Sequence, residues 1–422
     1  MAKIVIIGCG IGGLAFTLKY TGNAEIEIYE ARDRSDLGYP WYDTIKLSSF
    51  TDNGFDIPTF ALEKKKRFYM TMPDSKGKIV QKKKIEISRA EINRMDFIDY
   101  LLSLAEEKAK IYFKNGVSSL YFVDNRVAGV VLNNGRIVKA DFVIDASGGF
   151  SRIRSELPLD VFDYQPQNSE TMYYYRACFM ANDDVEPPEY DSVYLKSMGE
   201  NALSWLRTAP NGNLDVFIGH MGELSDKFID KVLTDLRKRD SRLTNKSYFV
   251  RRGKLALRYP LSQIVFDNLA LVGDSAYMSM PMTGSGMDNA IFAGVILSDV
   301  VSDIKNDDYS IKSLWKYQYK YFRLLGCNMY IADIILKYGM TLEEKDVFWF
   351  FDEIVGGEIS VKDLQRKIKG VVERKALTAS GVKLVSRIIK GWSIARLVPI
   401  IYDENVVQNW RKRYNDLIKN GE

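Results

Sequence analysis

The stretch Lys3-Ile4-Val5-Ile6-Ile7-Gly8-Cys9-Gly10-Ile11-Gly12-Gly13 decides the fold of this chain. Its apolar first half predicts a buried strand, and the glycines end that strand before a helix over roughly residues 14–20. Gly8 permits the tight turn, Gly10 lets the backbone come close to a ligand, and Gly13 lets helix and strand pack closely. The stretch therefore predicts the start of a βαβ unit whose turn is open to a ligand.

A second strand and an acid complete this pattern. Residues 26–30, Ile-Glu-Ile-Tyr-Glu, predict a parallel strand that ends in Glu30, seventeen residues after Gly13. Glu30 is placed to accept a hydrogen bond from a ribose hydroxyl, while the free N–H groups at the helix N-terminus bind phosphates. Together these parts predict a dinucleotide site. The alternative is a glycine-rich strand–helix turn without a ligand.

A glycine-rich segment late in the chain decides which dinucleotide is expected. The apolar run 269–272 ends in Gly273-Asp274, and a loop from Pro281 to Gly286 precedes a helix near Met287. Asp274 can bind a ribityl hydroxyl, and the helix N-terminus can face the negative edge of a reduced flavin. Simple nicotinamide dehydrogenases need no such element, and the sequence has no second dinucleotide fingerprint. We therefore expect FAD and no dedicated NAD(P)H domain.

Further residues are expected beside the cofactor. Asp145-Ala146-Ser147-Gly148 ends another apolar strand, and Arg94 begins a helix that approaches the phosphates in folds of this kind. Solvated surface residues are the alternative for both. The expected FAD-binding residues are Gly8, Gly10, Ile11, Gly12, Gly13, Glu30, Ala31, Arg32, Arg94, Val117, Ser147, Gly148, Gly273, Asp274, Pro281, Gly284, Ser285, Gly286 and Met287.

Composition excludes several other classes. The chain has 422 residues, 46% of them hydrophobic, and its net charge of +4 gives no basis for a nucleic-acid surface. Three scattered cysteines and one histidine, His220, exclude a disulfide framework and a histidine metal cluster, so we expect no metal. His220 is expected to be structural, with a role as an acid as the alternative. No apolar run reaches the ~18 residues of a membrane span, and no signal peptide precedes the first strand. We therefore expect a cytoplasmic protein.

The order of elements predicts an α/β fold with a Rossmann-like FAD-binding domain, an antiparallel-sheet substrate domain and a helical C-terminal region. The FAD-binding domain is expected to be discontinuous, over residues 1–50, 85–165 and 265–300. The substrate domain is expected over 51–84 and 166–264, and the helical region over 301–422. The basic clusters 64–67 and 82–84 are interpreted as solvated lysines on an exposed antiparallel excursion.

Several stretches beyond the FAD motifs resemble one family. They are Tyr175-Arg176 at the start of a strand, 191–195, the run from Trp205 to Pro210, Asn211-Gly212, Phe217-Ile218-Gly219 and, above all, 269–294. In order and spacing they resemble the archaeal geranylgeranyl reductases, flavoproteins of the p-hydroxybenzoate hydroxylase-like (glutathione reductase type) fold. The resemblance covers nearly the whole chain, strongly at the FAD elements and loosely as far as Trp410-Arg411-Lys412.

The chain departs from that family at two places. Where the family often has Pro-Cys-Gly followed by an acid, this chain has Pro40-Trp41-Tyr42-Asp43, so the acid is kept and the cysteine is replaced by Trp41. Where the family's aromatic strand reads Tyr-x-Trp-x-Phe-Pro, residues 203–210 keep the Trp and the Pro alone. A cysteine-based redox step is therefore unsupported, and these changes bear on the substrate more than on the fold.

The resemblance implies reduction of isoprenoid carbon–carbon double bonds by reduced FAD. Its substrate would be an archaeal ether-lipid precursor or the side chain of an isoprenoid quinone, with ferredoxin or NAD(P)H as the electron donor. The expected substrate-binding residues are Trp41, Asp43, Tyr175, Trp205 and Phe217, for which plain core packing is the alternative; the catalytic residues stay unknown. Two other functions stay open: a flavin-dependent monooxygenase or halogenase, and a flavoprotein without turnover.

The C-terminal region adds one expectation. Val382, Val385, Ile389 and Trp392 share one helical face, with Lys383, Arg387 and Lys390 beside it. This face either packs against the flavin domain or lies on an anionic membrane surface, as a peripheral contact at the inner face of the membrane.

Overall fold

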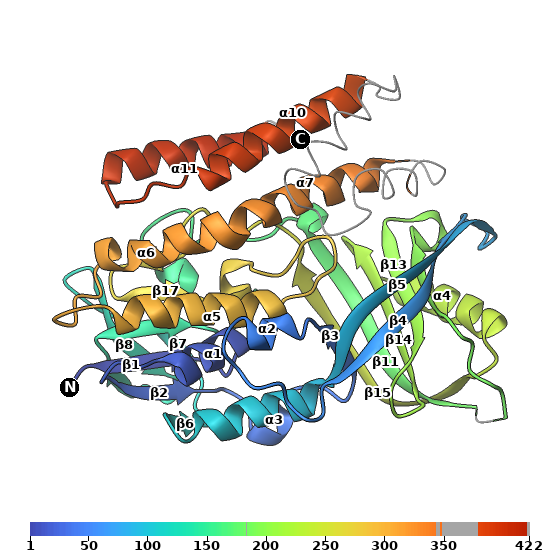
Figure 1. Cartoon of the computed structure of the whole chain (residues 1–422), viewed down its shortest axis with the longest axis horizontal. Helices are drawn as coiled ribbons and strands as arrows, with labels where there is room; N and C mark the ends of the chain where they lie inside the picture. Colours follow the sequence, from blue (N-terminus) through green and yellow to red (C-terminus); the bar gives the residue numbers. More distant parts are fainter. Residues whose placement is uncertain (183, 343–346, 348–378, 420–422) are drawn as a thin grey trace.

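We describe the protein from a computed structural model of the chain, over residues 1–182, 184–342, 347 and 379–419. Two sheets lie side by side, and the C-terminal helices lie along one side of both (Figure 1). The smaller sheet contains the N-terminal strand, and the larger sheet follows at the opposite end of the long axis. These three parts correspond to the three kinds of region that the sequence pattern predicts.

The first sheet has six strands in the order β16-β17-β10-β1-β2-β6. Its strands are β1 (Lys3–Ile7), β2 (Glu25–Tyr29), β6 (Lys110–Tyr112), β10 (Phe142–Asp145), β16 (Val265–Phe266) and β17 (Leu269–Leu271). The pairs β1–β2, β1–β10, β2–β6 and β10–β17 are parallel, and β16 runs antiparallel to β17. Because β17 pairs with β10, the late glycine-rich segment starts from the same sheet edge as the first one.

Helices α1 (Ile11–Lys19), α3 (Arg94–Ala105) and α5 (Met287–Ser302) pack with this sheet, and the short α2 (Ser48–Thr51) lies nearby. Helices α1 and α5 touch at two glycines: a Cβ added at Gly294 would lie 2.2 Å from the Gly12 carbonyl oxygen. A three-stranded sheet of β7 (Val117–Val123), β8 (Arg126–Leu132) and β9 (Ile137–Lys139) completes this part, and the turn between β8 and β9 contains Asn133–Gly135. The predicted strand–turn–helix order is confirmed here.

The second sheet has eight strands in the order β15-β11-β14-β13-β12-β4-β5-β3. They are β3 (Tyr42–Ile45), β4 (Leu62–Pro73), β5 (Ile79–Asn93), β11 (Thr171–Ala181), β12 (Asp191–Leu195), β13 (Ala202–Thr208), β14 (Leu214–Met221) and β15 (Leu243–Ala256). The pairs are antiparallel except β12–β4, which is parallel. The boundary expected at residue 85 lies inside β5, because this strand continues to Asn93.

Helix α4 (Asp226–Arg239) covers one face of this sheet. Its buried side, which includes Phe228, Val232 and Leu236, packs with Tyr175, Val216 and other residues of the sheet in one apolar cluster. The opposite face of the sheet is left to the cavity described below. The period of two along each strand thus separates a packed face from a cavity face.

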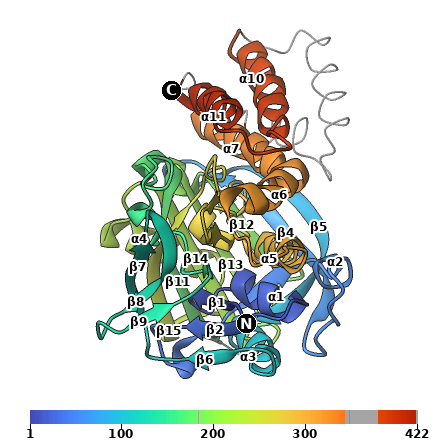
Figure 2. The ribbon, with the colours of Figure 1, turned by 90° about the vertical axis from the view of Figure 1, so that its left-hand side faces the viewer.

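The C-terminal helices are α6 (Ile311–Tyr321), a π-helical turn over Phe322–Gly326, α7 (Cys327–Thr341), α10 (Ala379–Arg396) and α11 (Glu404–Lys419). Figure 2 shows α10 and α11 as a layer beyond α6 and α7. An aromatic cluster joins the layers, in which the rings of Phe322 and Trp410 lie 5.3 Å apart and those of Tyr330 and Tyr414 5.6 Å apart. Of the predicted helical face on α10, Ile389 is exposed, while the side chains of Val382, Lys383 and Val385 lie outside the described residues.

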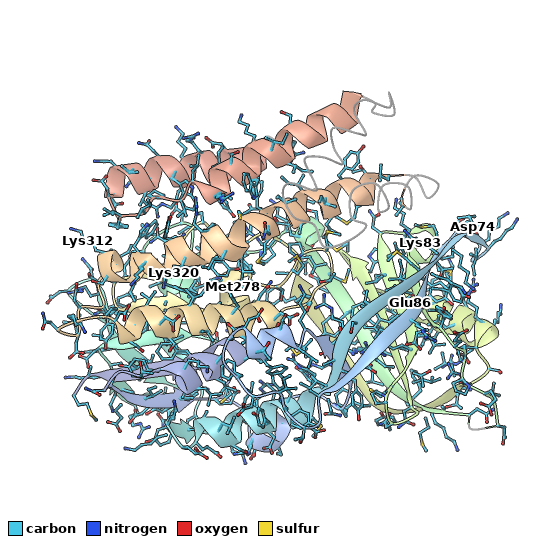
Figure 3. All side chains as sticks on the ribbon, viewed as in Figure 1. Asp74, Lys83, Glu86, Met278, Lys312 and Lys320 are labelled. Carbon is cyan, nitrogen blue, oxygen red and sulfur yellow. The ribbon has the colours of Figure 1, made fainter. Side chains whose placement is uncertain are left out.

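The excursion formed by β4 and β5 is antiparallel as expected, but its lysines are not simply solvated. Figure 3 shows the hairpin reaching out to Asp74, with Lys83 and Glu86 along β5. Lys66 is turned inward, where its Nζ lies 2.5 Å from the Glu91 carboxylate and its side chain is 12% exposed. The Nζ of Lys82 lies 3.5 Å from the centre of the Tyr69 ring. The expectation of solvated lysines is therefore wrong for Lys66, because Glu91 on the neighbouring strand gives it a buried partner.

Candidate functional site

One large cavity of about 1540 Å³ joins the two sheets. At one end it is lined by the turn after β1 and by the late glycine loop, and at the other by the second sheet and by α7. Two segments that lie far apart in the sequence, Gly8–Gly12 and Gly284–Met287, therefore face the same space. The prediction that both belong to one site agrees with this arrangement.

The turn after β1 has the close packing that its glycines predict. Gly8 has a φ of +83°, and a Cβ added at Gly10 would lie 2.4 Å from the Ala146 carbonyl oxygen on the neighbouring strand end. No side chain of the described residues caps the N-terminus of α1, and its first turn contains no acid. The free N–H groups and the positive end of the helix are therefore available to an anion.

Glu30 is held in place by the backbone beside this turn. Its Oε2 accepts a hydrogen bond from the Cys9 N–H at 2.9 Å, and its Oε1 accepts one from the Arg32 N–H at 3.0 Å. The residue is 5% exposed yet lines the cavity. Because a carboxylate has about four lone-pair directions, Glu30 keeps acceptor capacity for a ribose hydroxyl.

Two carboxylates, Asp274 of the late glycine-rich segment and Asp145 at the end of β10, are held by serine hydroxyls. Ser279 donates to Asp274 at 2.6 Å, and Ser147 and Ser151 donate to the two oxygens of Asp145 at 2.6 and 2.8 Å. Burial raises the pKa of both carboxyls above the usual range, while the serine hydroxyls lower it. Asp274 lines the cavity, where it can accept from a further hydroxyl.

Arg94 supplies the clearest test of whether the residues fit a dinucleotide. Its Nε is buried and has no hydrogen-bond partner among the described residues, although the side chain lines the cavity. The nearest acid, Asp43, has its Oδ2 3.7 Å from that nitrogen, which is an ion pair at long distance. An unsatisfied buried guanidinium N–H is costly, so a phosphate in the cavity would fit this group.

Of the residues predicted to bind FAD, all but two line the cavity. Gly13 lies behind it, where an added Cβ would come within 2.8 Å of the Ile6 side chain, which is the packing role expected of this glycine. Pro281 is buried beside Met282, and it is Met282 that lines the cavity. Both residues belong to the loops that shape the site without facing the cavity.

The cavity face of the second sheet carries a row of charged side chains, which we call the charged row. Neighbouring strands each contribute one residue, and the seven members are Arg176 (β11), Asp215 (β14), Arg207 (β13), Asp191 (β12), Lys66 (β4), Glu91 (β5) and Asp43 (β3). All but Asp215 and Glu91 line the cavity wall directly. With three cations and four anions, the row is nearly neutral as a whole.

Ion pairs connect the members of the charged row. Arg176 contacts Asp43 at 2.8 Å and Asp215 at 2.8 Å, and Arg207 contacts Asp215 at 2.6 Å. Although burial alone would raise it, the two arginines hold the pKa of Asp215 at about 2. The pKa of Asp43 is likewise lowered by Arg176 and Arg94 against the effect of burial. Asp191, with Lys66 at a longer 3.8 Å, has its pKa raised by burial.

Two residues further along each strand, the same face becomes aromatic. Tyr174, Phe217 and Trp205 form stacked rings across β11, β14 and β13, with centroid separations of 5.7 and 4.2 Å. The Trp205 Nε1 is buried without a hydrogen-bond partner among the described residues. Phe68 on β4 also lines this level of the cavity.

Beyond the aromatic rings the cavity wall is aliphatic. This level, which we call the aliphatic row, comprises Met172, Met221, Leu203, Leu195 and Met70 on the sheet, and α7 faces it with Ile335, Leu336 and Met340. The wall therefore changes from charged to aromatic to aliphatic along the strands. Such a gradient can take an elongated apolar ligand in one orientation.

Trp41 lies next to the charged row. Its indole stacks on Tyr39 at 4.3 Å and on the Arg176 guanidinium at 4.3 Å, and its Nε1 donates to Asp43 at 3.3 Å. Trp41 is 5% exposed, so the bulky side chain is part of the cavity wall and not a surface residue. Trp41, Asp43, Trp205 and Phe217 are thus brought together as the sequence predicts.

Tyr175 is not part of this site. Its side chain is on the opposite face of β11 and packs in the cluster under α4, because side chains alternate along a strand. Its neighbours Tyr174 and Arg176 line the cavity instead. His220 also lies on the α4 side, with its ring 5.2 Å from Phe228 and its Nε2 3.0 Å from Glu200, which agrees with the structural role expected of it.

Sequence reasoning missed most of the charged row. The residues Arg176, Arg207, Asp215, Asp191, Lys66 and Glu91 were not among the expected site residues. The available signal was a charged residue in an otherwise apolar or alternating strand, such as Asp215 before Val216. That signal does not say which strands are neighbours.

Three further features of the described residues concern a metal site, a reactive thiol and a membrane span. They contain no group of three or more His, Cys, Asp or Glu side chains that could hold a metal ion. Cys9, Cys178 and Cys327 are free and buried, and burial raises the pKa of each thiol. Within the described part of the chain, no helix has the length and apolar character needed to cross a bilayer.

The fold is that of FAD-dependent reductases and monooxygenases. A geranylgeranyl bacteriochlorophyll reductase-like protein from Thermoplasma acidophilum superposes with a TM-score of 0.70 at 19% identity, covering 89% of this chain and 99% of that one. HpxO of Klebsiella pneumoniae, solved in complex with FAD, gives a TM-score of 0.58 at 16% identity, over 88% and 99% of the two chains. These structures show that the chain has the fold of FAD-dependent oxidoreductases, as predicted.

Sequence comparison points to a particular group within this class. The chain is 26% identical over 336 residues to the digeranylgeranylglycerophospholipid reductase of Thermoplasma volcanium, covering 75% of this chain and 82% of the relative. It is 22% identical over 385 residues to the enzyme of the same name from Methanothrix thermoacetophila, covering 87% and 95%. No family model matches the chain. These relatives confirm the resemblance to the geranylgeranyl reductases.

Proposed function

We propose that this protein is an FAD-dependent reductase of carbon–carbon double bonds in an isoprenoid lipid or quinone side chain. The observation that carries the proposal is a single cavity that continues from the dinucleotide turn to the aliphatic row. The names of the curated relatives support the same chemistry, since they are reductases of a digeranylgeranyl lipid.

The cofactor would be held by the residues of the two glycine segments. The N-terminus of α1 and Arg94 would bind the pyrophosphate, Glu30 the adenosine ribose, and Asp274 the ribityl chain. Val117, Ala31 and Arg32 line the cavity near Glu30 and would surround the adenine end. When bound, reduced FAD supplies a hydride, and this is the chemistry that a saturating enzyme needs.

The wall of the cavity would orient the substrate. Isolated alkenes are poor electrophiles, so the contribution of the protein is chiefly to hold the chain in place and to exclude water. The aliphatic row and α7 would bind the isoprenoid chain, and the rings of Tyr174, Phe217 and Trp205 would keep a double bond beside the flavin end. The charged row closes the wall with side chains that are largely paired with one another, which weakens its attraction for a free ion.

The proton that completes the reduction must reach the second carbon of the double bond. Among groups lining the cavity, those of the charged row are tied in ion pairs, and no single one is assigned as the donor. Electrons would come from ferredoxin or NAD(P)H, and a peripheral position at the inner face of the membrane stays the prediction for its location.

A direct test uses the reduced holoprotein under anaerobic conditions. Incubation with a geranylgeranyl lipid is expected to raise the product mass by two hydrogens for each double bond reduced, in step with reoxidation of the flavin. A flavin-dependent monooxygenase would instead give an oxygenated product when oxygen is admitted. A bound flavin that is reduced but changes no lipid would contradict the proposal and would favour a flavoprotein without turnover.

A further inference from the structure

The loop between α10 and α11 exposes apolar side chains to an unusual degree. Ile401, Ile400 and Leu397 are 78%, 69% and 63% exposed, and apart from Met1 they are the most exposed large apolar side chains of the described residues. Val406, in the first turn of α11, is 52% exposed. By contrast, the tip of the β4–β5 hairpin has Val80 at 46%. Concentrated exposure of this kind marks a contact surface.

A shallow groove lies behind this loop, between the two helices. It has a volume of about 280 Å³ and is lined by Leu397, Pro399 and Val406, with Arg413 at its side. Trp410 closes the groove and is itself satisfied, because its Nε1 donates to the Ile394 carbonyl oxygen at 2.8 Å. Arg413 is exposed and makes no ion pair with the described residues. An apolar groove beside a guanidinium fits a hydrocarbon chain that carries a phosphate.

The charge of the two helices favours an anionic surface. Residues 379–419 contain eight lysines and arginines but three acids, a net charge of +5, whereas the whole chain has +4. α10 itself has four basic residues and no acidic one. Two of the acids are engaged: Asp403 accepts from the Val406 N–H at 3.0 Å, and Glu404 accepts from Gln408 at 2.9 Å. The two helices and their loop therefore carry a clear net positive charge.

We propose that the loop Leu397–Ile401 inserts into the head-group region of an anionic lipid bilayer, with Arg413 on a lipid phosphate. Exposed isoleucines beside basic residues are the combination by which peripheral proteins bind such surfaces. A second copy of the chain is a poorer occupant, because pairing this surface with itself would bring two clusters of +5 together. The inference rests on the proposed function, since isoprenoid lipids reside in membranes.

The binding test uses the full-length holoprotein and vesicles. Cosedimentation with phosphatidylglycerol vesicles is expected to be at least ~10-fold stronger than with phosphatidylcholine and to weaken with salt. The double variant I400S/I401S is expected to lower the affinity about tenfold or more. Arg413→Gln is expected to lower it about threefold and to reduce its salt dependence. Both variants should keep their bound flavin, which shows that they are folded.

A second measurement locates the inserted segment. Ile401→Trp is expected to give fluorescence that brominated phosphatidylglycerol quenches, whereas the matched control Val80→Trp, at the exposed hairpin tip, should not be quenched. Equal binding by I400S/I401S, quenching of the Val80→Trp control alone, or no vesicle binding by the wild type would each overturn the inference. So would a wild-type dimer that becomes monomeric in I400S/I401S, or an indole emission in the Ile401→Trp variant that is already shielded from acrylamide without vesicles.

These outcomes are separable from those of the proposed function. Turnover of a geranylgeranyl lipid dispersed in detergent tests the reaction without a membrane, and I400S/I401S is expected to match the wild type there. Vesicle binding without any turnover would refute the reductase but leave the membrane surface in place. Turnover without vesicle binding would support the reductase and refute the membrane surface.

Discussion

The two ends of the cavity are built in different ways. The end proposed to bind FAD, the dinucleotide end, depends on backbone: Gly8 and Gly10 shape a turn, and the N-terminus of α1 has no side-chain cap. The end proposed to bind substrate, the substrate end, depends on side chains from all eight strands of the second sheet and from α7. Backbone motifs are local in sequence, whereas a wall of side chains requires knowledge of which strands are neighbours. Substitutions at the two ends should therefore fail differently.

The largest effect is expected at the charged row. Arg176→Ala would leave the buried Asp215 and the partly exposed Asp43 without their main partner, and losing one member of a buried ion pair costs about 3–5 kcal/mol. Chemical denaturation should show this loss in the free energy of unfolding. Arg67→Ala is the matched control, since Arg67 on β4 makes exposed pairs with Glu86 and Glu189 and should cost about 0–1 kcal/mol. Equal losses in the two variants would show that the charged row is not a buried network.

At the other end, Gly10→Ala should affect the cofactor more than the fold. The new Cβ would lie 2.4 Å from the Ala146 carbonyl oxygen, so the turn must shift. Overpacking of this kind costs about 1–3 kcal/mol. When this cost destabilises the flavin-bound protein relative to the free protein, flavin affinity drops about ten- to a hundredfold. Equilibrium dialysis measures the affinity of each variant for FAD. Gly149→Ala is the control, because its nearest atom lies 3.5 Å away; a similar loss there would contradict the steric explanation.

The helix that faces the aliphatic row should give the protein a pH dependence. On α7, burial raises the pKa of Asp333 to about 6 despite Lys337, which lies 3.2 Å away. The folded state thus favours the protonated carboxyl. The protonated carboxyl therefore contributes about 2–3 kcal/mol to the stability of the folded state. This contribution is fully present below the usual carboxyl pKa near 4 and is lost as the pH rises through 6. The free energy of unfolding should fall between pH 4 and 6, and Asp333→Asn should remove that slope.

Asp215 is expected to change the free energy of unfolding with pH in the opposite direction. Its pKa of about 2 means that its stabilising contribution is present above pH 4 and is lost as the pH falls toward 2. A wild-type profile without a fall between pH 4 and 6, or an unchanged slope in the Asp333→Asn variant, would show that Asp333 does not titrate in this way.

The aliphatic row should set how much of the substrate is bound. Leu203→Trp would fill part of this level with a larger side chain, and displacing about one isoprene contact should raise KM about tenfold, which corresponds to about 1.4 kcal/mol. Flavin affinity should not change, because residue 203 lies on the second sheet. Turnover of lipids of different length, at saturating reductant, measures the effect. An unchanged KM for every length would remove the aliphatic row from the substrate path.

The sequence predicted the dinucleotide end well because its signals are local. The turn at Gly8–Gly13, the acid at Glu30 and the late Gly273–Asp274 segment each follow from a few adjacent residues whose backbone requirements are known. The parallel pairing of β1 with β2 follows from the same pattern.

The substrate end could be predicted only in part. Trp41 and Asp43 were found because a resemblance pointed to them, and Trp205 and Phe217 because aromatic strands were visible. The charged row could not be found, since Arg176, Asp215 and Arg207 meet only through the strand order β11-β14-β13. That order is a property of the sheet and is not encoded in any one segment. Lys66, interpreted as solvated, meets Glu91 only because β4 pairs with β5.

Tyr175 shows the same limit at a single residue, and it gives the smallest expected effect. Residues 173, 174 and 175 are all tyrosines, so the strand shows no alternation of residue types at these positions. The sequence therefore cannot tell which of the tyrosines faces the cavity. The structure puts Tyr175 under α4 and Tyr174 in the cavity wall. Tyr175→Phe removes one hydroxyl and keeps the ring, so KM and kcat should stay within about twofold, with about 0.5 kcal/mol or less lost in stability. Tyr174→Leu, which breaks the stack with Phe217, should raise KM several-fold, and a reversed ranking of the two variants would mean that β11 presents its other face.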